Sequence, residues 1–79
     1  MMIFLIEYDR RRGELITFRS FADSERRNAE EARLDMELKL HRVGTEHEVV
    51  ILEAATEEAL RRTHRRYFES LSELVNSPA

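Results

Sequence analysis

Residues 2–21 read MIFLIEYDRRRGELITFRSF, two apolar segments on either side of a charged turn. Residues 2–8 and 14–21 are rich in β-branched and aromatic side chains, which favour strands. Between them, Asp9 can start a turn and Gly13 can adopt a positive φ angle without steric cost. The stretch therefore predicts a β-hairpin.

A third strand is predicted further along the chain, at residues 48–54. Its centre, Val49-Val50-Ile51-Leu52, is a short continuous apolar run. Runs of this kind are typical of strands that are contacted on both faces.

A helix is predicted between the hairpin and the third strand, from about Ser24 to Val43. Asp23 or Ser24 can cap its first turn, and Gly44 can end it in a left-handed conformation. Apolar residues recur at helical spacing and form one stripe. They are Ala29, Ala32, Met36, Leu40 and Val43.

The same segment also allows a strand. Leu34, Met36, Leu38 and Leu40 alternate with charged residues, and such a strand could pair with residues 48–54 across the turn at Gly44. Helix is favoured because Leu, Met, Glu and Lys are good helix formers and poor strand formers. As a helix, the segment would place Leu34 and Leu38 away from the apolar stripe, where they are either exposed or in contact with a partner.

A second helix is predicted after Thr56, whose side chain can cap it. Glu57 and Glu58 then lie beside the positive end of the helix dipole. Residues 76–79 follow this helix as a frayed tail. The apolar stripe of this second helix consists of Leu60, Thr63, His64, Tyr67, Phe68, Leu71, Leu74 and Val75.

These elements predict a single α+β domain over residues 1–75, with the order ββαβα. A crossover through the first helix returns the third strand parallel to the second. The first strand is the most apolar and is expected at the centre, which gives the spatial order 2-1-3. We expect two layers, with both helices on one face of the sheet, and the sequence leaves open which face that is.

An uncovered sheet face follows from this two-layer arrangement. Alternation along the strands places large aliphatic residues on the face without helices. A domain of 79 residues has a thin core, so such a surface favours a homodimer or a larger protein partner. The predicted protein interface consists of Ile3, Leu5, Leu15, Val49 and Ile51.

Composition limits the location and the partners of the protein. The chain has no cysteine, which fits a reducing cytoplasm. Its longest apolar run, residues 1–6, is too short to span a membrane. The net charge of −3 argues against strong non-specific binding to nucleic acid, because that binding depends on a basic excess.

Two arginine clusters keep an anion-binding alternative open. Arg10, Arg11 and Arg12 form the hairpin tip and could contact phosphate. The basic run at residues 61–66 lies opposite the apolar stripe of the second helix, where glutamates at helical spacing predict a solvated, ion-paired face. The alternative function is therefore a nucleic-acid-associated or regulatory domain.

The histidines do not predict a catalytic or metal site. His41 and His47 flank Gly44 without zinc-type spacing. His64 lies in the apolar stripe, where it could act as a general base or, more simply, form the margin of the core. We predict no catalytic, metal or cofactor-binding residues, no enzyme activity and no cofactor. The leading prediction is a non-catalytic interaction module.

Overall fold

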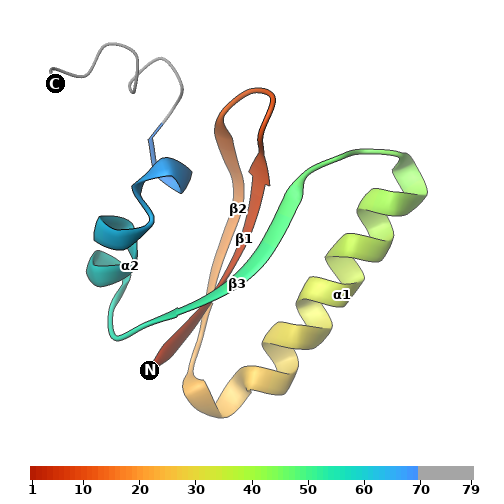
Figure 1. Ribbon diagram of the computed structural model, residues 1–79. Helices are drawn as coiled ribbons and strands as arrows, with labels where there is room; N and C mark the ends of the chain where they lie inside the picture. Colours follow the sequence, from red (N-terminus) through yellow and green to blue (C-terminus); the bar gives the residue numbers. More distant parts are fainter. Residues whose placement is uncertain (70–79) are drawn as a thin grey trace, which may run out of the picture.

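The structure is a computed structural model and describes residues 1–69 of the chain. Three strands form one sheet, and two α-helices pack against it (Figure 1). The elements in chain order are β1 (Met2–Asp9), β2 (Glu14–Phe21), the 3₁₀ helix η1 (Asp23–Glu25), α1 (Arg26–Val43), β3 (Glu48–Ala54), α2 (Glu57–Thr63) and the 3₁₀ helix η2 (Arg65–Tyr67).

The three strands form an antiparallel sheet in the order β2-β1-β3, which confirms the predicted order and the α+β class. Strands β2 and β3 both run antiparallel to β1 and are therefore parallel to each other. The turn between β1 and β2 is closed by Asp9, whose Oδ1 accepts hydrogen bonds from the amides of Arg11 and Arg12. Gly13 has a φ of 65° and donates to the Asp9 carbonyl at 2.8 Å.

A β-bulge interrupts strand β2. Glu7 lies opposite Thr17, whereas the next residue of β1, Tyr8, lies opposite Leu15, so Ile16 has no partner on β1. An extra residue of this kind reverses the alternation of side chains along its strand. Leu15 therefore lies on the same face as Phe18, and Ile16 is left exposed.

The helices cover opposite faces of the sheet, and the prediction that both lie on one face was wrong (Figure 1). Helix α1 covers Ile3 and Leu5, which pack with Phe21 and Ala29. On the other face, α2 and η2 cover Phe4, Ile6 and Tyr8. Their contacts come from Leu60 and Tyr67. Because β1 is apolar on both faces, one helical layer on each side buries more of it than two layers on one side.

Helix α1 is continuous, which excludes the alternative strand at residues 34–40. Gly44 ends it with a φ of 71°, as predicted, and the Thr45 amide donates to the Leu40 carbonyl at 3.0 Å. The predicted cap at Asp23 or Ser24 was wrong. Instead, the Glu25 carboxylate accepts a hydrogen bond from the Ala22 amide at 3.0 Å, at the start of η1.

Helix α2 begins as predicted but ends early. The Thr56 hydroxyl caps it by accepting a hydrogen bond from the Ala59 amide at 3.0 Å. At His64 the backbone leaves the helical conformation, with φ −124° and ψ 51°, so the single longer helix predicted here was wrong. The predicted stripe residues Leu71, Leu74 and Val75, and the predicted tail at residues 76–79, lie outside the described residues.

Candidate functional site

The residues predicted to form an interface do not form an uncovered sheet face. Ile3 and Leu5 are fully buried beneath α1. Val49 and Ile51 are partly buried against the same cluster. The bulge places Leu15 on the opposite face, in the cluster with Phe4 and Ile6. The two-layer premise of that prediction therefore fails.

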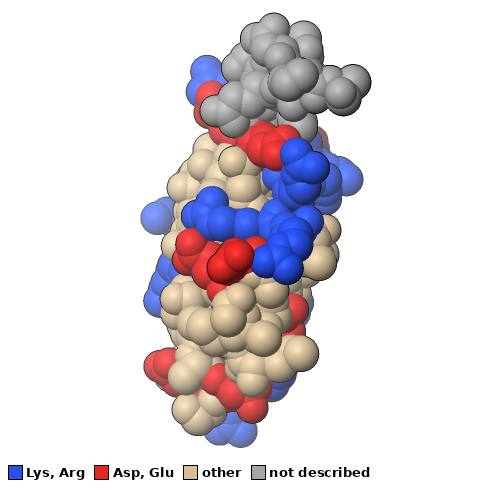
Figure 2. Space-filling view, turned by 90° about the vertical axis from the view of Figure 1, so that its left-hand side faces the viewer, with Lys and Arg blue, Asp and Glu red and all other residues tan. Residues whose placement is uncertain are grey.

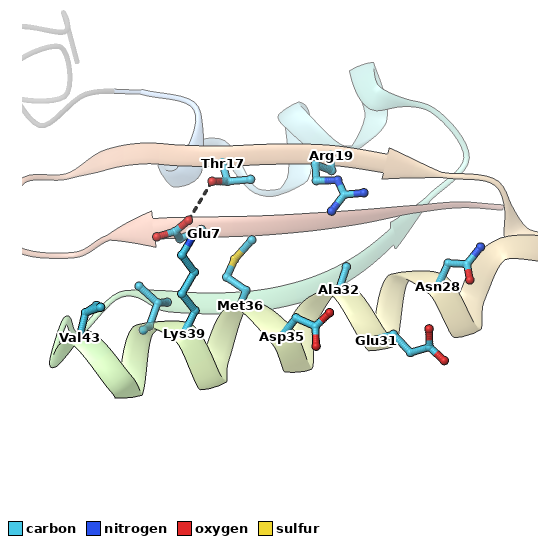
Figure 3. Close-up of a pocket in the computed structure, with 11 residues that line it drawn as sticks. Glu7, Thr17, Arg19, Asn28, Glu31, Ala32, Asp35, Met36, Lys39 and Val43 are labelled. Atoms are coloured by element: carbon cyan, nitrogen blue, oxygen red, sulfur yellow. Dashed lines mark hydrogen bonds between the residues drawn. The ribbon is translucent and has the colours of Figure 1, made fainter.

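A groove of about 600 Å³ lies between α1 and strand β2 (Figure 3). It exists because α1 packs mainly on Ile3, Leu5, Val49 and Ile51 of β1 and β3. Beyond Phe21, the part of this face that belongs to β2 stays open, and Thr17 and Arg19 form the floor of the groove. The α1 wall consists of Asn28, Glu31, Ala32, Asp35, Met36, Lys39, Leu40 and Val43.

A buried carboxylate lies at the floor of this groove. Glu7 is only 8% exposed, and its Oε1 accepts a hydrogen bond from the Thr17 hydroxyl at 2.8 Å. Its Oε2 lies 2.6 Å from Nδ1 of His47, just before β3. Nε2 of the same imidazole lies 3.6 Å from Asp9 Oδ2. Lys39 also points toward Glu7 from α1 (Figure 3). This acid thus has polar neighbours on both sides of β1.

The outer edge of β2 is a second open surface. Within residues 1–69, β2 pairs with β1 alone, so its other edge has no neighbouring strand. Ile16 stands at this edge with 46% of its surface exposed. Glu14 and Arg19 are exposed near the two ends of the strand, and neither forms an ion pair with another described residue. The Arg19 guanidinium instead lies 4.9 Å from the centre of the Phe21 ring.

A network centred on Glu48 joins the hairpin turn, β3 and η2. Glu48 Oε2 accepts hydrogen bonds from the Tyr67 hydroxyl and from Arg66, the latter at 2.9 Å. Oε1 lies 3.0 Å from Arg10 Nε, in an ion pair without a hydrogen bond. Burial alone would raise the pKa of Glu48, but the bond from Tyr67 and the charges of Arg66 and Arg10 outweigh it and lower the pKa.

The arginines of α2 and η2 are neutralised by nearby glutamates. Arg61, Arg62 and Arg65 contact Glu57, Glu58 and Glu69, each at 3.0 Å, and Arg66 is bound by Glu48. Basic and acidic side chains accordingly lie next to each other on this side of the molecule (Figure 2). The pairs of Arg61, Arg62 and Arg65 have the spacing of four residues that the sequence predicted for a solvated helix face.

The predicted anion-contact cluster at the hairpin tip is divided by the structure. Arg10 is held by Glu48. Arg11 and Arg12 are exposed and form no ion pair with residues 1–69. The tip thus offers two arginines and not three.

Neither a metal cluster nor a membrane-spanning helix is found among the described residues. No group of three or more His, Cys, Asp or Glu residues is placed to hold a metal ion within residues 1–69. In the same part of the chain, no helix combines the length and the apolar character that a membrane span needs. His64 is partly exposed at the end of α2, with its ring centre 6.3 Å from that of Tyr67.

Sequence reasoning missed the groove, the β2 edge and the Glu7–His47 contact. Two signals were present. The order 2-1-3 already makes the second strand an edge, and Glu7 interrupts an otherwise apolar strand. A charged residue at a buried position requires polar partners.

Comparison of the chain with protein-family models, curated proteins and solved structures gave no match.

Proposed function

We propose that this protein is a non-catalytic interaction module that binds a protein partner along the outer edge of β2 and the groove beside it. The observation that carries the proposal is the free edge of β2, eight residues long, with Ile16 exposed at its third position. Unpaired backbone groups on an edge strand can hydrogen-bond to an added strand.

The covered faces of the sheet support this choice of surface. Both faces carry a helical layer, so the only part of the sheet surface left open to a partner among the described residues is the groove beside β2. The groove extends the edge toward α1 and adds apolar contacts from Ala32, Met36 and Leu40. A strand that joins β2 could place alternate side chains in this groove.

The arrangement of the polar side chains supports a non-catalytic role. Glu48 is held by three side chains, and Glu7 is shared between Thr17 and His47. A catalytic acid or base must reach a substrate from a position within hydrogen-bond range. These two carboxylates instead connect strands and turns of the protein itself.

The nucleic-acid alternative has weaker support. Four arginines at residues 61–66 contact carboxylates, which reduces the positive charge available to phosphate. Arg11 and Arg12 remain without ion pairs among the described residues, but the net charge of the whole chain is −3.

We also propose a cytoplasmic location, because the chain has no cysteine.

Site-specific photo-crosslinking in the cells that make the protein tests the interaction. A photoreactive amino acid replaces Ile16 at the β2 edge, and the matched control carries it at Leu34, which is 54% exposed on α1. We expect discrete crosslinked protein products from position 16 and none, or far fewer, from position 34. Equal yields from the two positions, or no product from position 16, would contradict the proposal.

A further inference from the structure

We infer that the partner is a second copy of this chain, which pairs its own β2 antiparallel to the first about a two-fold axis between Ile16 and Thr17. This inference rests on the proposed function and names the partner of the same edge. In a two-fold interface, each contact occurs twice, with the two residues exchanged between the copies. A strand that pairs with itself must therefore carry complementary residues at symmetric positions.

The charges of β2 are complementary in this register. Glu14 of one copy lies opposite Arg19 of the other, and the same pair recurs across the axis. Both side chains are exposed, and neither has an ionic partner among the described residues of its own chain. Cross-strand pairs of opposite charge stabilise antiparallel strands, whereas like charges destabilise them.

The bulge makes this pairing sterically consistent. Glu14 and Arg19 are five positions apart, and regular alternation would send them to opposite faces of the sheet. With Ile16 as an extra residue, Glu14 lies opposite Asp9, and Arg19 lies opposite Leu5. Asp9 and Leu5 lie on the same face of β1, so the register assigns both charged residues to the α1 face. Directly opposed residues in a sheet must share a face, and this condition is met.

The remaining pairs of the register are apolar or small. Leu15 lies opposite Phe18, and both belong to the face covered by α2. At the axis, Ile16 lies opposite Thr17. The exposed isoleucine would thus be covered by the partner strand. The resulting sheet has six strands, and the two grooves meet across its centre with an α1 helix on each outer side.

The other edge of the sheet does not offer the same complementarity. Strand β3 carries Glu48 and Glu53 as its only charged residues, and both are acidic. These residues are occupied by arginines of their own chain, Glu48 by Arg66 and Glu53 by Arg26. Self-pairing of β3 would therefore bring no new charge attraction. The assembly closes at two copies because each chain has one complementary edge.

Charge reversal in purified protein tests this arrangement. Sedimentation equilibrium and native mass spectrometry should show a dimer of the wild-type chain. In Glu14→Arg, the new arginine of each copy lies opposite Arg19 of the other copy. In Arg19→Glu, the new glutamate of each copy lies opposite Glu14 of the other copy. Each variant should raise the dimer dissociation constant by about tenfold or more. Glu30→Arg, an exposed reversal on α1, should leave it unchanged.

Mixing the two variants gives the decisive result. A chain with Glu14→Arg and a chain with Arg19→Glu complement each other at both contacts, so their mixture should form heterodimers in preference to either homodimer. Circular dichroism of each variant checks that it is folded. A folded wild-type chain that stays monomeric at high micromolar concentration would overturn the inference, as would a dimer that is insensitive to both reversals.

The outcome is separable from that of the photo-crosslinking experiment. Products of twice the chain mass from position 16 agree with a second copy. Products of other masses, together with a monomeric purified chain, overturn the inference and leave the proposed interaction module standing. The absence of any product from position 16 contradicts both.

Discussion

Tyr67 donates the hydrogen of its phenolic hydroxyl to Glu48, and this contact fixes η2 to the first residue of β3. Both groups are removed from solvent, and their pKa values shift in opposite directions. Burial raises the pKa of Tyr67, and the hydrogen bond to Glu48 and its negative charge raise it further, against the opposing charges of Arg66 and Arg10. The contact therefore links stability to pH at both ends of the scale.

At high pH, the wild-type protein should lose stability in a way that Tyr67→Phe does not. Because the pKa of Tyr67 is higher in the folded state, its contribution is complete below the ordinary tyrosine pKa of about 10 and is lost as pH rises through the folded value. Denaturant melts between neutral and strongly alkaline pH would measure this. Tyr8→Phe serves as the control and should keep the alkaline decline.

At low pH, Glu48 should account for part of the loss of stability. Its pKa is lowered in the folded state, so its contribution is present above the ordinary glutamate pKa of about 4.3 and disappears as pH falls through the folded value. Glu48→Gln should cost about 1–3 kcal/mol at neutral pH, because charged hydrogen bonds are lost. The variant should also show a shallower acid decline than Glu46→Gln, an exposed neighbour. Parallel acid profiles for the two variants would contradict this role.

Gly44→Ala should lower the free energy of unfolding by about 1 kcal/mol. The cause is the backbone alone, since φ is 71° and a Cβ at this position would meet no atom within 4 Å. Gly44→Asn should lose less, because asparagine tolerates the left-handed conformation better. Urea titrations of the three proteins measure the order. An alanine variant as stable as wild type would show that α1 ends differently.

Leu60→Ala should destabilise the protein by about 2–5 kcal/mol, as do other deletions of buried aliphatic side chains. Leu60 is fully buried against Phe4 and Ile6, whereas Arg62 lies on the exposed side of the same helix. Arg62→Ala should therefore change stability by less than about 0.5 kcal/mol, as is usual at the surface. Similar losses from both substitutions would mean that α2 packs by another face.

Local signals predicted the elements of the fold well. The apolar segments, the turn at Asp9 and Gly13, and the cap at Gly44 depend on neighbouring residues, and the structure confirms them. The helix at residues 26–43 also follows from local propensity, which outweighed the alternation from Leu34 to Leu40.

Long-range features were beyond the sequence pattern. The side of the sheet that α2 covers depends on the path of the chain after Ala54, which no periodicity encodes. The bulge at Ile16 depends on pairing with β1, and one extra residue was enough to move Leu15 to the other face. Both errors placed the predicted interface residues on an uncovered face, whereas the structure packs them beneath the helices.

Glu7 carries a further consequence for how the strands align. Its carboxylate contacts Thr17 on one neighbouring strand and His47 just before the other. A slip of either strand by one residue would move the partner to the opposite face and leave a buried acid without its hydrogen bond. A sheet with a misaligned strand would therefore be less stable, whereas an aliphatic residue at position 7 would tolerate the slip. Glu7 thus favours one alignment of all three strands.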